Sequence, residues 1–101
     1  MAIAEVSIVP LGTSTTSVSD FVAGAVSILK TSGLRFQLTA MGTLLEGDLV
    51  ALMETIRKMH ESPFCKGVQR VYTVIKIDDR RDQQTGMDYK VQSVQDKLKS
   101  I

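Results

Sequence analysis

Hydrophobic and polar residues alternate with a period of two in the segments that we predict to be β-strands. The segment from Ile3 to Val9 is rich in Ile and Val, and its polar positions fall two apart. The segment from Arg35 to Ala40 alternates throughout, and a Met41-Gly42 turn, in which Gly supplies a positive φ, leads into a short strand from Thr43 to Glu46. The segment from Arg70 to Ile77 is β-branched at most of its apolar positions, which predicts a final, well-buried strand.

Apolar residues recur every three or four positions in three other segments, which predicts amphipathic helices. We expect Pro10 and Gly12 to end the first strand before the first of these helices begins. The first helix is expected to begin with a capping box of Ser17 and Asp20 and to end at Gly33. The second is expected to begin at Asp48 and to end at Ser62-Pro63. The third is expected to run from about Met87 to Ser100, with a capping box of Thr85 and Asp88 at its start.

This order of elements predicts one α+β domain over residues 1–101, with a ferredoxin-like βαββαβ antiparallel sheet and an additional C-terminal helix. Right-handed crossovers place the two long helices on one face of the sheet. The opposite face is then open and mixed in character, and the terminal helix is expected to cover part of it or an edge strand. The residues expected on this open face are Glu5, Ser7, Gln37 and Thr39, with Val9 and Tyr72 or Val74 adding apolar surface. A mixed open face on one small domain favours a homo-oligomer.

Composition narrows the choice of partners and compartment. Twelve Lys and Arg oppose eleven Asp and Glu, so a net charge of +1 gives no field that would attract nucleic acid or an anionic membrane. No apolar stretch reaches the roughly 20 residues that a membrane-spanning helix requires. The single cysteine, Cys65, cannot form an internal disulfide, and the N-terminus has no secretory pattern, so we expect a cytoplasmic protein.

Few side chains are candidates for chemistry. One His and one Cys are too few for a zinc site, so no metal is expected. His60 is interpreted as a solvated cation at a helix end rather than as a catalytic base, and Cys65 as a half-buried, unreactive thiol.

The Ser/Thr-rich loop from Gly12 to Ser19 fits helix capping, with phosphate binding as the alternative. The charged run from Asp78 to Asp82 fits a solvated strand end, with subunit contacts as the alternative. Glu46 closes the hairpin, where it could meet a cationic ligand or a positive helix start.

Three motifs in the expected order resemble the thiamine-binding (YkoF-like) family. They are Glu5-Val-Ser-Ile-Val-Pro-Leu-Gly12, Met41-Gly-Thr-Leu-Leu-Glu-Gly47 and Arg70-Val-Tyr-Thr-Val-Ile-Lys-Ile-Asp-Asp-Arg80. The resemblance extends from about residue 4 to residue 98. It implies a ferredoxin-like fold, assembly into dimers or tetramers through sheet faces, and binding of thiamine or its hydroxymethylpyrimidine part without catalysis and without a cofactor.

The resemblance also suggests site residues. Ser7 and Glu5 lie in the first motif, Asp78 and Arg80 in the third. An aminopyrimidine requires a few fixed donors and acceptors, and a thiazolium cation favours a carboxylate or an aromatic face. The expected ligand-binding residues are Glu5, Ser7, Gln37, Thr39, Gly42, Thr43 and Glu46.

Other functions fit the sequence less well. An RNA-binding sheet would require more strand aromatics than Phe36 and Tyr72. An acylphosphatase-like hydrolase would require an Asn, and the chain has none. A structural or regulatory oligomeric protein with no metabolite ligand remains the main alternative.

Overall fold

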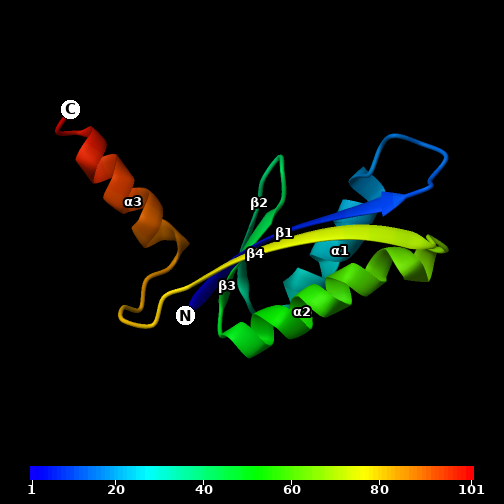
Figure 1. Ribbon diagram of the computed structural model, residues 1–101, viewed down its shortest axis with the longest axis horizontal. Helices are drawn as coiled ribbons and strands as arrows, with labels where there is room; N and C mark the ends of the chain where they lie inside the picture. Colours follow the sequence, from blue (N-terminus) through cyan, green and yellow to red (C-terminus); the bar gives the residue numbers. More distant parts are fainter.

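The computed structural model describes residues 1–101 and shows a four-stranded sheet, two helices packed on one face and a third helix that extends from one end (Figure 1). The elements are β1 (Ala2–Leu11), α1 (Ser19–Ser32), β2 (Arg35–Leu38), β3 (Thr43–Gly47), α2 (Leu49–Glu61), the short 3-10 helix η1 (Ser62–Lys66), β4 (Arg70–Asp79) and α3 (Met87–Leu98).

The strands follow the order β2-β3-β1-β4, and all neighbours are antiparallel. This confirms the predicted ferredoxin-like arrangement. β1 is longer than predicted, because it pairs with β4 along its whole length, from Ala2 opposite Asp79 to Leu11 opposite Arg70. Pro10 therefore does not end the strand. Beyond Val6, β1 has a neighbour on one side only, and a proline without an N–H is tolerated there.

The core lies between the sheet and the helices α1 and α2. Alternate residues of β1, at Ala2, Ala4 and Val6, are buried, and their small side chains let the helices approach the sheet closely. The helices and β3 complete the core, chiefly through Leu29, Leu45, Leu52, Ile56 and Met59. The residues between them on each strand point to the other face of the sheet, so the predicted alternation is confirmed.

β4 departs from its prediction, because none of its ten residues is buried within the single chain. Ile75 and Ile77 lie on the helix side of the sheet, yet they are 38% and 44% exposed. β4 is an edge strand of the sheet, and the helices cover only its first half, where Val71 and Thr73 are half-buried.

The helix ends agree only in part with the sequence patterns. Gly33 has the expected left-handed conformation, and Asp48 accepts hydrogen bonds from the N–H groups of Val50 and Ala51. The two predicted capping boxes are absent. α1 begins after Val18 without a side-chain cap, and α3 begins after Gly86 without one.

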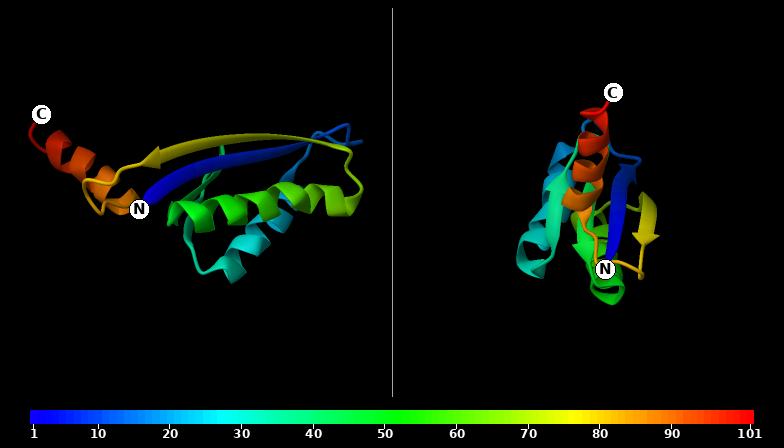
Figure 2. Two further views of the ribbon diagram at one scale, coloured as in Figure 1. Left: turned by 60° about the horizontal axis from the view of Figure 1, so that its bottom comes forward. Right: turned by 90° about the vertical axis from the view of Figure 1, so that its left-hand side faces the viewer.

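α3 extends away from the rest of the molecule (Figures 1 and 2). The radius of gyration is 15.4 Å, whereas a compact domain of about 100 residues has a value of about 13 Å. Only the start of α3 is anchored, and its apolar positions Val91, Val94 and Leu98 are exposed. The helix therefore covers neither the open face nor an edge strand over most of its length. None of the helices is long and apolar enough to cross a membrane.

Candidate functional site

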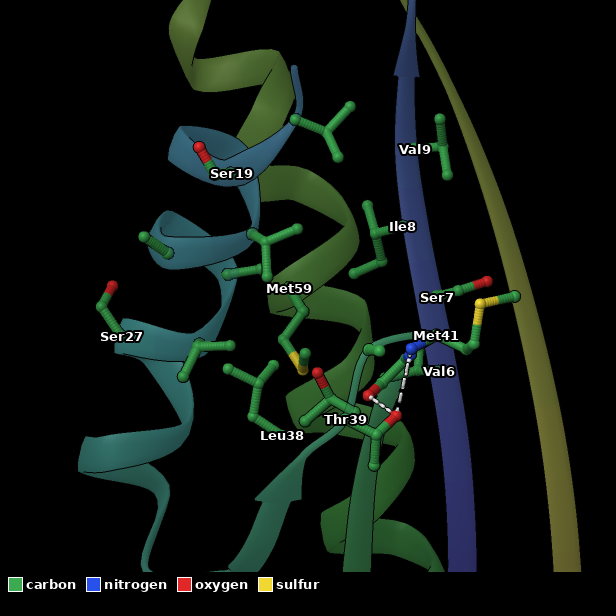
Figure 3. Close-up of a pocket in the computed structure, with 18 of the residues that line it drawn as sticks. Val6, Ser7, Ile8, Val9, Ser19, Ser27, Leu38, Thr39, Met41 and Met59 are labelled. Atoms are coloured by element: carbon green, nitrogen blue, oxygen red, sulfur yellow. Dashed lines mark hydrogen bonds between the residues drawn. The ribbon is translucent and has the colours of Figure 1, made fainter. Parts of the chain in front are cut away.

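A groove of about 800 Å³ lies between α1, the second half of β1 and the turn that joins β2 to β3 (Figure 3). It exists because β3 stops pairing with β1 at Val6, while β1 continues to Leu11. Past Val6, the side of β1 that faced β3 meets open space instead of another strand. Its volume falls within the range of about 300 to 1,000 Å³ that is usual for small-molecule sites.

The walls of the groove are mostly apolar. α1 contributes Val22 and Val26, β1 contributes Ile8, and the end of β2 contributes Leu38. Met59 of α2 also lines the groove, and its side chain is fully buried. Such a surface suits the flat faces of a ring rather than a highly hydrated ligand.

Hydroxyl groups supply polarity within these apolar walls. Thr43 lies where β3 meets the groove, is 5% exposed, and its hydroxyl has no hydrogen-bond partner within the chain. Thr39 differs, because its hydroxyl donates to the Gly42 carbonyl at 2.7 Å and accepts from the Gly42 N–H at 3.1 Å (Figure 3). Thr39 therefore shapes the turn, whereas the Thr43 hydroxyl is available to a ligand. The other hydroxyl-bearing residues in the lining are Ser7, Ser17, Ser19 and Ser27.

The backbone of β1 is the second source of polar groups. Along one edge, residues Ser7 to Leu11 have no strand partner, although β4 pairs with them on the other edge. Alternate peptide groups of a strand point to each edge, so N–H and C=O groups face the groove. These groups are fixed donors and acceptors next to the apolar walls, except that Pro10, which has no N–H, supplies a carbonyl alone.

Gly42 closes the β2–β3 turn against β1. It does not have the positive φ that we predicted for a tight hairpin. Its importance lies in a close approach, since a Cβ atom at this position would lie 3.0 Å from the carbonyl oxygen of Val6. The turn can thus reach the point at which β1 and β3 separate, which is the floor of the groove.

The electrostatics of the groove are simple. Lys30 is the one charged residue in its lining, and no Asp, Glu, His or Cys takes part. The groove thus contains no group that commonly acts as a general acid or base near neutral pH.

The seven predicted ligand-binding residues are divided between two places. Ser7, Thr39, Gly42 and Thr43 line the groove. The remaining three do not: Glu5 pairs with Lys76 at 3.6 Å, Gln37 is exposed on the outer face, and Glu46 lies beneath the start of α3. The predicted set was therefore not one cluster.

Glu46 is held by other parts of the chain. Its Oε2 atom accepts the backbone N–H of Met87 at 2.7 Å, and its Oε1 atom pairs with Arg35 at 3.2 Å. The side chain is only 11% exposed, and it packs so close to Gly86 that a Cβ there would lie 2.5 Å from Oε2. Of the two roles considered for this residue, the structure shows it at a helix start.

Arg35 links the Glu46 carboxylate to the first turn of α3. It contacts Asp88 at 2.7 Å as well as Glu46. The hydrogen bond from Arg35 lowers the pKa of the Asp88 carboxyl below its ordinary value, and the same bond raises the pKa of Arg35. A contact between Lys90 and Asp78 attaches the helix to β4.

The remaining candidate residues lie outside the groove or have partners within the chain. His60 is half-buried, its Nδ1 lies 2.7 Å from the Thr73 hydroxyl, and its ring meets Phe64 edge-on. Cys65 is exposed, so the prediction of a half-buried thiol was wrong. In the charged run after β4, Arg80 pairs with Asp82 and Arg81 with Asp79.

The sequence matches the family described as Thiamine-binding protein over residues 4–95. This match covers most of the chain. The chain belongs to the thiamine-binding protein family. The chain is 48% identical to a UPF0045 protein of Methanothermobacter thermautotrophicus over 97% of this chain and all of that protein. It is also 49% identical to the UPF0045 protein YqgV of Bacillus subtilis over 93% of this chain and 94% of that protein.

Solved structures of other proteins share the fold. A hypothetical protein from Methanocaldococcus jannaschii superposes with a TM-score of 0.83 at 38% identity, over 92% of this chain and 94% of that chain. A Thermotoga maritima protein proposed to act in thiamine biosynthesis or salvage superposes with a TM-score of 0.77 at 15% identity, over 92% of this chain and 97% of that chain. At that identity, the likeness to the second protein shows the fold alone.

The groove itself was not anticipated from the sequence. A signal for it was present, because the predicted first strand, Ile3 to Val9, is longer than its predicted neighbour, Thr43 to Glu46. Unequal strands leave part of the longer strand unpaired. The prediction considered only the faces of the sheet, so it overlooked an opening along a strand edge.

Proposed function

We propose that this protein binds thiamine, or a precursor such as hydroxymethylpyrimidine, in the groove beside β1, without catalysing a reaction. One observation carries the proposal: an apolar groove is bordered by an unpaired strand edge and by the free hydroxyl of Thr43. Membership of the thiamine-binding protein family supports a thiamine-related ligand, and the groove is the proposed place for it.

The chemistry of an aminopyrimidine matches this arrangement. Its faces are flat and apolar, while its edge carries an amino donor next to a ring-nitrogen acceptor. A strand edge presents N–H and C=O groups in alternation, so the ring edge can pair with β1 as another strand would. Its faces would then lie between the walls that Val26 and Leu38 provide.

Charge favours the pyrimidine part over the thiazolium part in the groove. The only charged lining residue is cationic Lys30, and no carboxylate is present to stabilise a positive ring. Within this proposal, Ser7, Thr39, Gly42 and Thr43 shape or contact the pyrimidine. Glu5, Gln37 and Glu46 lie elsewhere and are assigned no direct contact.

The absence of acidic, imidazole and thiol groups in the lining supports binding without catalysis. The proposal includes a homo-oligomer, a dimer or tetramer, because the outer face of the sheet exposes Val9 and Leu11 and α3 exposes Val91, Val94 and Leu98. It also includes a cytoplasmic setting, which rests on the exposed free thiol of Cys65.

Calorimetric titration of the purified protein with thiamine, hydroxymethylpyrimidine and thiamine diphosphate tests the proposal. We expect saturable binding of at least hydroxymethylpyrimidine, since it places no positive ring near Lys30. Silence toward all three compounds at millimolar concentration would contradict ligand binding. That result would favour the alternative, a structural or regulatory oligomer without a metabolite, for which the exposed apolar residues of α3 are the supporting observation.

A further inference from the structure

A second pocket lies at the end of the sheet far from α3, where β1 ends and β4 begins (Figure 1). Its volume is about 640 Å³, which is within the usual range for small-molecule sites. Residues 11–14, at the end of β1 and in the loop after it, form one wall, and residues 66–70, which join η1 to β4, form another. This pocket shares no lining residue with the groove beside β1, so it is a separate site.

Two cations and no carboxylate line this second pocket. Lys66 and Arg70 are both exposed, and neither takes part in an ion pair within the chain. Arg70 is exceptional in this respect, because each of the other arginines is paired with a carboxylate. The pocket therefore has a positive potential that an anionic ligand can neutralise.

The Lys66 ammonium is held beside α1. Its Nζ atom donates to the backbone carbonyl of Asp20 at 3.1 Å and lies 5.5 Å from the centroid of the Phe21 ring. Gly24, one turn further along the helix, leaves room for it, since a Cβ atom there would lie 2.8 Å from Nζ. An ammonium group has three N–H donors, so those that the Asp20 carbonyl does not use are free for a ligand.

Uncharged donors border the same pocket. The backbone N–H groups of Gly12, Thr13 and Ser14 have no acceptor within the chain, and Gly12 turns the chain out of β1 with a φ of 79°. Successive free N–H groups at a turn are backbone groups with which proteins bind anions. The Gln69 side chain, which also lines the pocket, adds an amide donor.

The Ser/Thr-rich loop after β1 does not have the capping role that its sequence predicts. α1 begins after Val18 without a side-chain cap, and the Ser17 and Ser19 hydroxyls lie 3.4 Å from each other. The Thr13 hydroxyl donates to the Thr15 carbonyl at 2.8 Å, which stabilises the shape of the loop itself. Phosphate binding, the alternative considered for this loop, agrees with the two cations that lie across the pocket from it.

We propose that this pocket binds the phosphoryl group of a small phosphate monoester. Such a group carries a charge of about −1.5 to −2 near neutral pH, which the two cations match, and its terminal oxygens accept several hydrogen bonds. A guanidinium such as that of Arg70 can pair with two phosphate oxygens at once. Leu11, Phe21 and Val68 provide apolar surface for the organic part of the ester. This inference does not depend on ligand binding in the groove.

Titration of the full chain with phenyl phosphate, at an ionic strength kept constant with sodium chloride, tests the proposal. We expect saturable binding, with amide chemical shifts that change in residues 11–14 and 66–70. Benzenesulfonate has the same ring but a single charge, and inorganic phosphate has no ring, so both should bind more weakly. Unchanged shifts in these two segments at millimolar phenyl phosphate would overturn the proposal, as would equal affinity for either of the other two anions.

Arg70→Gln is the most informative variant, because the Arg70 side chain forms no ion pair that the fold would lose. We expect it to bind phenyl phosphate about 10-fold more weakly, as for the loss of a charge-assisted hydrogen bond. Lys66→Gln should weaken binding to a similar extent. Thermal unfolding checks the fold of both variants, and unchanged affinity in both would contradict the proposal.

Lys58→Gln is the matched control. Lys58 is an exposed lysine of α2 outside the pocket, and its replacement changes the net charge by the same amount as Lys66→Gln. We expect its affinity for phenyl phosphate to equal that of the wild type, and an equal loss in Lys58→Gln and Lys66→Gln would overturn the proposal in favour of general charge attraction. Arg70→Gln should bind hydroxymethylpyrimidine as the wild type does, which keeps this test separate from that of the groove.

Discussion

Thr43 is the residue that best separates ligand binding from folding. Its hydroxyl faces the groove without an internal partner, while the rest of the side chain belongs to the buried surface of β3. Thr43→Val exchanges the hydroxyl for a methyl group of similar size and so removes the hydrogen-bonding group. We expect hydroxymethylpyrimidine to bind about 2- to 10-fold more weakly, as for the loss of one hydrogen bond of about 0.5 to 1.5 kcal/mol. Calorimetric titration measures this change, and thermal unfolding checks the fold.

The matched control for Thr43→Val is Thr55→Val. Thr55 is also a buried threonine, but it lies on α2 and not in the lining of the groove. We expect its substitution to leave the dissociation constant unchanged. Equal weakening in both variants would show that the effect comes from the fold rather than from contact with the ligand.

The ion pair between Asp88 and Arg35, which helps to attach the start of α3, depends on pH. The hydrogen bond from Arg35 lowers the pKa of this carboxyl, so the ion pair favours the anchored helix above the ordinary aspartate pKa of about 3.9. The contribution is lost as the pH falls through the lowered value, and solvent exposure keeps it small. An NMR titration of the Asp88 carboxyl carbon should show the low pKa, and Arg35→Gln should return it to the ordinary range. An unchanged pKa in that variant would contradict the pairing.

At the scale of the elements, the attachment of α3 depends on Glu46. Its carboxylate accepts the Met87 N–H, and Met87 is 5% exposed. Glu46→Ala leaves that buried N–H without a partner, which costs about 1 to 3 kcal/mol. We expect faster amide hydrogen exchange from residue 87 to residue 90, while exchange in β1 stays unchanged.

Glu54→Ala is the control for this experiment. Glu54 is a carboxylate of the surface of α2, where it pairs with Arg57. Because an exposed ion pair contributes little, its removal should leave exchange in α3 as it is in the wild type. Equal acceleration in the two variants would contradict the anchoring role of Glu46.

The elements were largely predictable because each depends on local periodicity. Apolar residues at helical spacing predicted α1 and α2, and alternation placed Phe36 and Leu38 on the helix side of β2. The starts of α1 and α3 were less predictable. Ser17 and Thr85 match local capping patterns, but the start of α3 is set instead by Glu46, a residue distant in sequence.

The site was harder to predict than the fold for a similar reason. Alternation identifies the two faces of a sheet, so Ser7 and Thr39 were assigned to an open face together with Glu5 and Gln37. The groove arises from how far β3 runs alongside β1, which depends on pairing between separate segments. The turn at Gly42 ends that pairing through a close approach to Val6, which a pattern of residue types does not reveal.

At the scale of the whole molecule, the groove and the free edge of β4 lie on opposite sides of β1. The groove opens where β1 has lost its β3 neighbour, and β4 covers the other edge of the same strand. The groove is therefore open on the side of β1 that β4 does not cover.

The central claim is that a pyrimidine binds in the groove beside β1. Amide chemical shifts of the isotope-labelled protein, followed during titration with hydroxymethylpyrimidine, test it most directly. We expect the shifts to change in three segments that border the groove, residues 7–9, 18–22 and 41–43. Changes confined to Arg35, Gln37 and Lys76 on the outer face, or no changes at millimolar ligand, would contradict the claim.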